Sequence, residues 1–64
     1  MNNNIRDRRG ERGWTQQDLA ERLGVSRQTV IAVENGKYDP SLPLAMRIAR
    51  QFRCRIEDLF FLEA

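Results

Sequence analysis

Apolar residues recur at helical spacing in three short segments of the chain. Leu19, Ala20 and Leu23 lie at positions i, i+1 and i+4, so they form one narrow stripe on an α-helix. Val30 and Val33 repeat the pattern with a spacing of three. A longer stripe toward the carboxyl end consists of Leu42, Ala45, Ile48, Ala49 and Phe52. Each segment predicts an amphipathic helix with one buried face.

Residues that start and stop helices bound these stripes. Thr15 is followed three residues later by Asp18, which is the spacing of a capping box, so a helix is expected to begin there. Ser26 gives a second start signal after a tight turn. The expected ends are marked by Gly24 and by the Asn35-Gly36 pair, which favour the left-handed conformation in which many helices end.

The predicted fold is therefore all-α, with five short helices in a single domain of 64 residues. Ile5 is the only large apolar residue of the first helix, and Ser41 caps the fourth after an Asp39-Pro40 turn. By residue number, the expected helices are roughly 3–12, 15–23, 26–34, 41–52 and 56–60. The second and third form a helix-turn-helix over about residues 15–35.

The composition narrows the classes of function. The chain has no histidine and one cysteine, Cys54, so an internal disulfide is excluded and the commonest metal ligand and general base are missing. The sequence also lacks a nucleophile–base pair, metal-ligand spacing and a glycine-rich phosphate loop after a strand. We therefore expect no enzyme activity, no metal and no cofactor.

Charge and hydropathy permit a nucleic-acid partner without requiring one. The net charge is only +2, but Lys37 is the sole lysine among the 11 basic residues. The others are arginines, whose planar guanidinium suits phosphate and guanine. No apolar run approaches the roughly 20 residues that a membrane span needs, and the first residues are polar. We expect a cytoplasmic protein without a membrane partner.

Residues Thr15 to Leu42, TQQDLAERLGVSRQTVIAVENGKYDPSL, resemble the helix-turn-helix of the phage repressor and Cro family, also called the xenobiotic-response-element family of bacterial regulators. The segment contains, in order, a helix start, a glycine turn, a second helix start and the ending Glu34-Asn35-Gly36-Lys37. A weaker resemblance extends from Ile5 to Phe60. The resemblance implies a minimal, lambda-repressor-like DNA-binding domain with no separate ligand-binding domain, so no small-molecule ligand is expected.

The resemblance assigns base-reading roles to the start of the recognition helix, 26–34. Arg27 and Gln28 match the family's base-reading positions, and their side chains suit guanine O6/N7 and adenine N6/N7, respectively. Thr29 and Ala32 are assigned to the same surface. A thymine methyl contact, a phosphate contact or simple helix packing would each explain a small residue at these two positions.

Contacts with the DNA backbone are implied for residues on both sides of the recognition helix. Gln16 matches a glutamine that meets the backbone at a helix start, where free N–H groups favour phosphate. Asn35 and Lys37 match the backbone-contacting segment after the recognition helix. Gln17 and Ser26 are expected on the same surface.

The first helix combines a family feature with two departures. Arg9 and Glu34 match a pair that forms an ion bridge between the first and third helices in many relatives. Arg8 stands where relatives usually have a core leucine, and Gly10 lies inside the helix, at a cost of about 1 kcal/mol relative to alanine. We expect this helix to be loosely held.

Four further positions carry open or weak signals. Arg53 replaces the glycine common after the fourth helix, and Arg55 replaces a Ser-type cap, so these boundaries are weakly specified. Ile31 faces outward, where it would touch a thymine methyl or pack against the amino-terminal segment. Cys54 is expected to be a small, partly buried residue, and a redox-sensing role is the less favoured interpretation.

The chain ends in a compact apolar tail, Phe60, Phe61 and Leu62. This tail favours a protein partner, because so small a domain seldom exposes such a cluster. We expect a homodimer that regulates transcription, as a repressor. It would bind a near-palindromic operator of double-stranded DNA. The expected dimer residues are Ile56, Leu59, Phe60, Phe61 and Leu62. Some small relatives also pair their chain ends into a short antiparallel ribbon, and the segment from Phe60 to Glu63 has the alternation for it.

A second interpretation treats the chain as a protein-interaction module, of an antitoxin-like or anti-regulator kind. In that case the helix-turn-helix would be a scaffold and the apolar tail would carry the function. Salt separates the two hypotheses, because binding to an operator weakens steeply as salt rises, whereas an apolar protein contact is much less sensitive.

Overall fold

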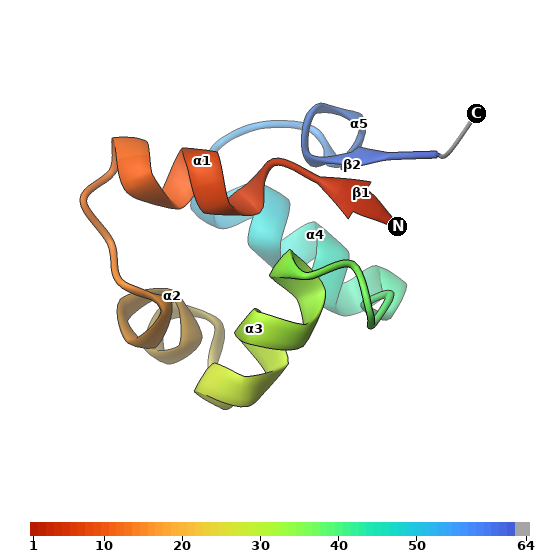
Figure 1. Cartoon of the computed structure of the whole chain (residues 1–64). Helices are drawn as coiled ribbons and strands as arrows, with labels where there is room; N and C mark the ends of the chain where they lie inside the picture. The colour runs from red at the N-terminus through yellow and green to blue at the C-terminus, as the bar shows by residue number, and fades with distance from the viewer. Residues whose placement is uncertain (63–64) are drawn as a thin grey trace.

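The computed structural model describes residues 1–62 as five helices and a two-stranded antiparallel ribbon (Figure 1). The elements in chain order are β1 (Asn2–Asn3), α1 (Ile5–Glu11), α2 (Gln16–Leu23), α3 (Arg27–Glu34), α4 (Leu42–Gln51), α5 (Ile56–Leu59) and β2 (Phe60–Phe61). The predicted five-helix fold is confirmed, and the chain ends form a ribbon. Among these residues no helix is both long and apolar enough to cross a membrane.

The predicted capping box is present at the start of α2. The Thr15 hydroxyl accepts a hydrogen bond from the Asp18 backbone N–H at 3.0 Å, and the Asp18 carboxylate accepts one from the Thr15 N–H at 2.9 Å. The backbone and side-chain hydrogen bonds from Thr15 hold the pKa of Asp18 below its ordinary value. Ser26 caps α3 in a similar way, because its hydroxyl accepts from the Thr29 N–H at 3.2 Å.

Glycines end the first three helices in the left-handed conformation. Gly13, Gly24 and Gly36 have φ angles of 70°, 72° and 75°. After α2, the backbone N–H of Val25 bonds to the carbonyl of Ala20 at 3.0 Å, which completes a Schellman motif.

The fourth helix ends in the same motif without a glycine. Arg53 has a φ of 53°, and the N–H of Cys54 bonds to the carbonyl of Ala49 at 3.0 Å. A residue with a Cβ is less stable than glycine in this conformation by about 1 kcal/mol. The helix thus ends before Arg53 although the sequence has no glycine there, and the hydrogen bond from Cys54 to Ala49 closes the motif.

The core lies between the helices, and the predicted stripes supply most of it. The most deeply buried large side chains are Ile5, Leu19, Ile48 and Leu59. One stripe position was predicted wrongly, because Leu42 is 65% exposed. Leu42 shares a helix face with the buried Ala49, but it is the first residue of α4 and lies at the helix end, outside the core cluster.

The first helix begins at Ile5, not at Asn3 as predicted. Asn3 belongs to β1 and pairs with Phe60 of β2. Its side chain accepts a hydrogen bond from the Ile5 N–H at 3.1 Å and donates one to the Val33 carbonyl at 2.8 Å. These bonds hold Asn3 outside the helix, and they connect the amino-terminal strand to the end of α3.

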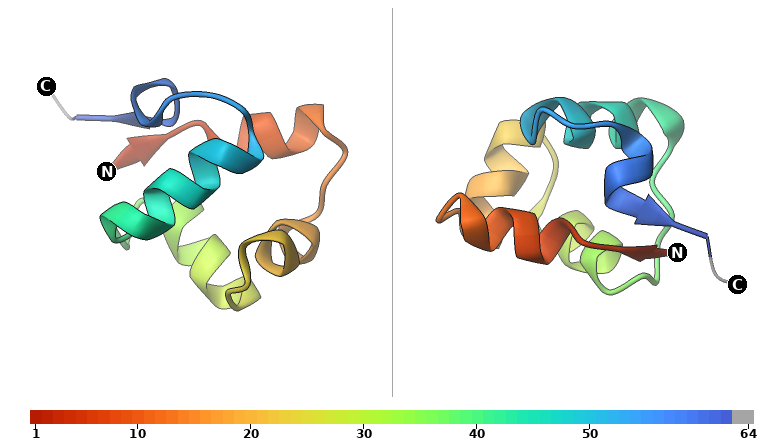
Figure 2. Two further views of the ribbon diagram at one scale, coloured as in Figure 1. Left: turned by 180° about the vertical axis from the view of Figure 1, so that it is seen from behind. Right: turned by 90° about the horizontal axis from the view of Figure 1, so that it is seen from above.

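The fifth helix ends at Leu59, one residue earlier than predicted, because Phe60 enters the ribbon. The ribbon pairs Asn2 with Phe61 and Asn3 with Phe60. The two strands lie side by side at one edge of the molecule, next to α5 (Figure 2). Glu63, which was included in the ribbon prediction, lies outside the described residues.

Polar contacts attach α1 to α5. The Asn4 side chain donates to the Asp58 carbonyl at 3.0 Å, and its backbone N–H donates to the Leu59 carbonyl at 3.0 Å. Arg8, which we expected to leave α1 loosely held, is half-buried. It donates to the Asn4 side-chain oxygen at 3.3 Å and to the Asp58 carbonyl at 3.4 Å. Where relatives usually have a core leucine, Arg8 thus makes polar contacts with α5.

Candidate nucleic-acid interface

The turn between α2 and α3 is held in place by α4. The Arg47 guanidinium donates a hydrogen bond to the carbonyl of Leu23, the last residue of α2. It lies so close to the turn that a Cβ added at Gly24 would be 3.3 Å from the Arg47 Nη2 atom. Sequence reasoning missed this contact, because nothing in the local pattern links an exposed arginine of α4 to the turn.

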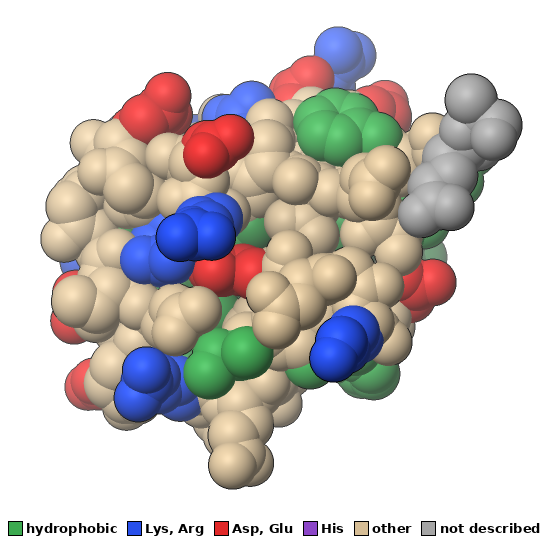
Figure 3. Space-filling view, in the orientation of Figure 1, with side chains coloured by type: hydrophobic (Ala, Val, Ile, Leu, Met, Phe, Trp, Pro, Cys, Tyr) green, Lys and Arg blue, Asp and Glu red, His purple; other side chains and the backbone are tan. Residues whose placement is uncertain are grey.

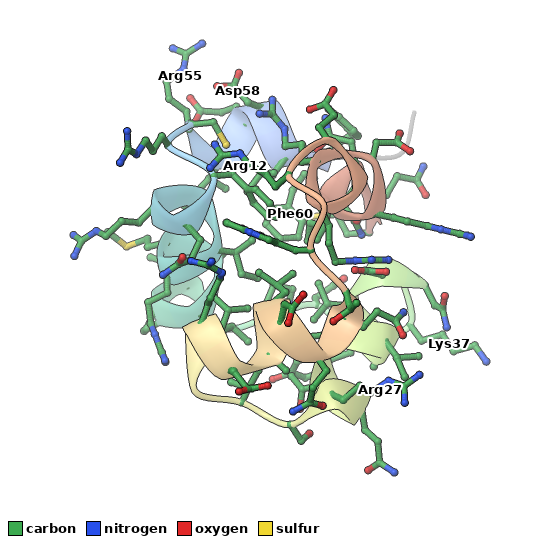
Figure 4. The ribbon with its side chains drawn as sticks, turned by 90° about the vertical axis from the view of Figure 1, so that its left-hand side faces the viewer. Arg12, Arg27, Lys37, Arg55, Asp58 and Phe60 are labelled. Atoms are coloured by element: carbon green, nitrogen blue, oxygen red, sulfur yellow. The ribbon has the colours of Figure 1, made fainter. Side chains whose placement is uncertain are left out.

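The start of α3 presents two exposed polar side chains. Arg27 and Gln28 are exposed, whereas Val30 and Val33 on the other face of α3 are buried. Figure 4 shows Arg27 and Lys37 extending from the same side of the molecule. The structure therefore places these two cations on one surface, with the core behind it.

The other residues assigned to base contacts are less accessible. Thr29 and Ala32 are half-buried, and so is Ile31. The Thr29 hydroxyl lies 3.0 Å from the hydroxyl of Ser26, which is also the cap of α3. Thr29 and Ser26 therefore contribute to the helix start, and Arg27 and Gln28 are the side chains that reach outward.

A partly buried ion pair joins α1 and α3. Arg9 Nε lies 2.8 Å from Glu34 Oε2, and Arg9 Nη1 donates to the Trp14 carbonyl at 2.9 Å. The side chains of Arg9 and Glu34 are only 15% and 4% exposed. Gln16 joins this group, because its amide donates to Glu34 Oε1 at 3.3 Å. The network fixes α3 relative to α1 and to the start of α2.

These residues surround a hollow of about 770 Å³ on the face formed by α1, α2 and α3. Figure 3 shows basic side chains spread over this face, with an acidic group between them. Six residues that the sequence assigned to DNA contacts or to the ion pair line the hollow: Arg9, Gln16, Gln17, Arg27, Glu34 and Asn35. Arg6 also lines it, and sequence reasoning gave this residue no role.

Two other arginines, Arg12 and Arg22, are exposed but contact the Trp14 ring. The Arg22 guanidinium lies 4.1 Å from the centre of the Trp14 ring, and Trp14 packs against Phe52 with ring centroids 5.5 Å apart. Arg12 lies 5.4 Å from the Trp14 ring and donates to the Phe52 carbonyl at 3.0 Å. Cation–π contacts of this kind stabilise the fold and leave these arginines less available to a ligand.

The tail differs in part from the predicted dimer surface. Leu59 is fully buried in the core of its own protomer, so its assignment to the dimer interface was wrong. The side chain is needed where α5 packs on the other helices. Ile56 and Phe60 are half-buried against the core, whereas Phe61 is 43% and Leu62 is 84% exposed.

Cys54 is half-buried and packs against the core, as expected for a small structural residue. Within residues 1–62 no group of three histidine, cysteine, aspartate or glutamate residues is placed to hold a metal ion.

Comparison with known proteins agrees with this geometry. A family model described as helix-turn-helix matches residues 5–59. An uncharacterised helix-turn-helix-type transcriptional regulator of Methanocaldococcus jannaschii is 56% identical over 63 residues, which cover 98% of this chain and 96% of the relative. A second uncharacterised regulator of this type, YgzD of Bacillus subtilis, is 46% identical over 63 residues, with the same coverage of both chains.

Among solved structures, the restriction-modification controller protein C.AhdI of Aeromonas hydrophila superposes with a TM-score of 0.79 at 30% identity. The match covers 88% of this chain and 85% of the controller protein. The chain belongs to the helix-turn-helix family, and the resemblance to the phage repressor and Cro type is confirmed.

Proposed function

We propose that the chain is a transcriptional regulator that binds double-stranded DNA sequence-specifically through α3, as a single DNA-binding domain over residues 1–64. The observation that carries this proposal is the exposure of Arg27 and Gln28 at the start of α3, on the same side of the molecule as Lys37. A helix fits the major groove, where arginine pairs with guanine and glutamine with adenine. The helix-turn-helix family and the names of its relatives support the same function.

In this proposal the remaining assigned residues position α3 on the duplex. Lys37 and Asn35 contact phosphates after α3, and Gln17 and Ser26 do so at the starts of α2 and α3. Gln16 is held by Glu34, so it acts in the same place only if it shares its amide between the carboxylate and a phosphate. Thr29 and Ala32 lie at the edge of the base-reading surface, where small side chains allow close approach of a base.

We further propose that two copies associate through the exposed part of the tail, with Phe61 and Leu62 at the centre and Ile56 and Phe60 at its border. Two-fold symmetry would then place the two copies of α3 in successive major grooves, roughly 34 Å apart, on a near-palindromic operator. A protein bound in this way excludes other proteins from the same DNA, which is the basis for proposing repression. We also propose that the chain acts in the cytoplasm, where it would find its DNA operator.

Selection of bound fragments from random duplex DNA tests recognition, followed by affinity measurements on the selected site. Arg27→Ala should weaken binding by about 1 to 3 kcal/mol and relax the preference at one base position. Lys37→Ala should weaken binding to all sequences by a similar factor. If neither variant changes binding to any duplex, the assigned recognition surface is wrong.

Sedimentation tests the dimer. Phe61→Asp places a charge on the exposed apolar tail and should shift the protein toward monomer. Arg50→Asp, on the exposed face of α4, is the matched control and should leave the oligomeric state unchanged. An unaltered dimer in the Phe61 variant would remove the tail from the interface.

The exposed Phe61 and Leu62 also support a second candidate, a protein-interaction module in which the helix-turn-helix is a scaffold. The two functions differ in their dependence on salt, because only phosphate binding releases counterions. A wild-type protein that selects no DNA motif, and whose complex with a protein partner is insensitive to salt, would favour this candidate.

A further inference from the structure

Two arginines from different helices line the hollow between α1, α2 and α3. Arg6 comes from α1 and Arg27 from the start of α3, and both are exposed. Arg27 is the proposed base-reading residue and also lines the hollow, so DNA bound at Arg27 would lie next to the hollow. The hollow therefore belongs to the same face as the recognition helix, although α1 supplies part of its lining.

The charge of the hollow is positive. Its lining contains three guanidinium groups, of Arg6, Arg9 and Arg27, and one carboxylate, of Glu34. Arg9 neutralises Glu34 at 2.8 Å. Within residues 1–62, neither Arg6 nor Arg27 takes part in an ion pair. Two unneutralised guanidinium groups thus face a concave surface whose only acidic group already has a partner.

Arg6 differs in this respect from most other arginines of the protein. Arg8 bonds to α5, Arg12 and Arg22 flank the Trp14 ring, and Arg47 caps α2. Among the described residues the Arg6 side chain has neither a hydrogen bond nor an ion pair, so its guanidinium donors are available to a ligand. A phosphate accepts hydrogen bonds from guanidinium in a planar, two-pronged geometry, which makes it the ligand that best suits the site.

We propose that Arg6 is a further DNA-contacting residue, which binds a backbone phosphate at the hollow while Arg27 reads the adjacent groove. This inference rests on the proposed DNA-binding function and extends the contact surface from α2 and α3 to α1. A phosphate contact positions the protein without reading sequence. Arg6 therefore contributes to affinity for any duplex and not to the choice of operator.

The test is the salt dependence of binding for Arg6→Gln, with Arg50→Gln as the matched control. Both substitutions remove one positive charge from an exposed position, but Arg50 lies in the last turn of α4 and is not among the residues that line the hollow. Affinities for the selected operator and for random duplex DNA are measured from about 0.05 to 0.3 M salt, a range that spans ordinary screening lengths. Thermal melting checks that both variants are folded.

A plot of log K against log salt falls as salt rises, and loss of one phosphate contact should make this slope less steep by about 0.9. It should also weaken binding roughly eightfold at 0.1 M salt. The loss should be equal on operator and random DNA and should shrink as salt rises. Arg6→Lys should keep the wild-type slope, because it keeps the charge. Arg50→Gln should also keep it.

An Arg6→Gln slope equal to that of the wild type, or equal to that of Arg50→Gln, overturns the proposal for Arg6. A different result would overturn the proposed function: the wild-type protein would bind the selected operator and random DNA equally well. In that case the slope on random DNA still decides the role of Arg6. A wild-type protein that binds no duplex overturns both.

Discussion

The helix-turn-helix and the chain ends are stabilised by contacts of different range. At the start of α2, Thr15 and Asp18 bond to each other across three residues. At the chain ends, Asn4 bonds to Asp58 across 54 residues, and Asn3 bonds to Val33 across 30. The first kind of contact forms within one turn of helix, whereas the second requires the fold to be present.

This difference shows where the sequence pattern is a sufficient guide. Caps and glycines define α2 and α3 because the interacting groups are neighbours in the chain. The amino-terminal strand of the ribbon has no such signals, since asparagine is depleted in strands and β1 has only two residues, Asn2 and Asn3. It forms because side chains of Asn3 and Asn4 fasten it to α3 and α5.

The largest effect is expected at Glu34, where the helix-turn-helix itself depends on a distant partner. Glu34→Ala leaves the partly buried Arg9 unpaired, so we expect the free energy of unfolding to fall by about 3 kcal/mol. Urea unfolding measures this change. The control is Glu21→Ala, on the exposed face of α2, with an expected loss of about 0.5 kcal/mol or less. Equal losses would mean that local signals alone stabilise α3.

Asn3→Ala tests the long-range contacts of the chain ends. The substitution removes two hydrogen bonds, to Ile5 and Val33, and should lower the free energy of unfolding by roughly 2 kcal/mol. Asn2 is exposed, and Asn2→Ala should have little effect. Hydrogen exchange should show faster opening of β1 and β2 in the Asn3 variant. If the two variants are equally stable, these bonds do not hold the ribbon.

Arg53→Gly tests the helix end that lacks a local signal. At a φ of 53° glycine avoids the Cβ penalty, which exceeds its entropic cost in the unfolded chain, so we expect stability to rise by about 0.5 kcal/mol. Arg50→Gly, in the last turn of α4, is the matched control and should lower stability by about 1 kcal/mol. A destabilised Arg53 variant would show that the arginine side chain contributes more than the conformation costs.

The smallest effect concerns the local contact of Asp18 and depends on pH. Because its pKa is lowered in the folded state, Asp18 contributes stability above its unfolded pKa of about 3.9, and this contribution is lost as the pH falls through the folded pKa. The difference in melting temperature between wild type and Asp18→Asn should therefore be largest near neutral pH and should diminish below about pH 4. In a Thr15→Ala background the difference should be smaller at every pH.

Local patterns in the sequence predicted much of the fold. The starts of α2 and α3, their ends at Gly24 and Gly36, and the buried faces of both helices were predicted, because each depends on interactions within four or five residues. The exposure of Arg27 and Gln28 follows from the same helical period, since Val30 and Val33 take the opposite face.

The tertiary structure alone decided which distant residues meet. It buried Leu59 in the core, left Leu42 exposed, and brought Arg47 to the turn after Leu23. It also placed Arg6 beside the recognition helix, in a hollow that no segment forms alone. The physical reason is that a periodic pattern gives the direction of a side chain around its own helix axis, whereas its neighbours depend on how the helices pack against one another.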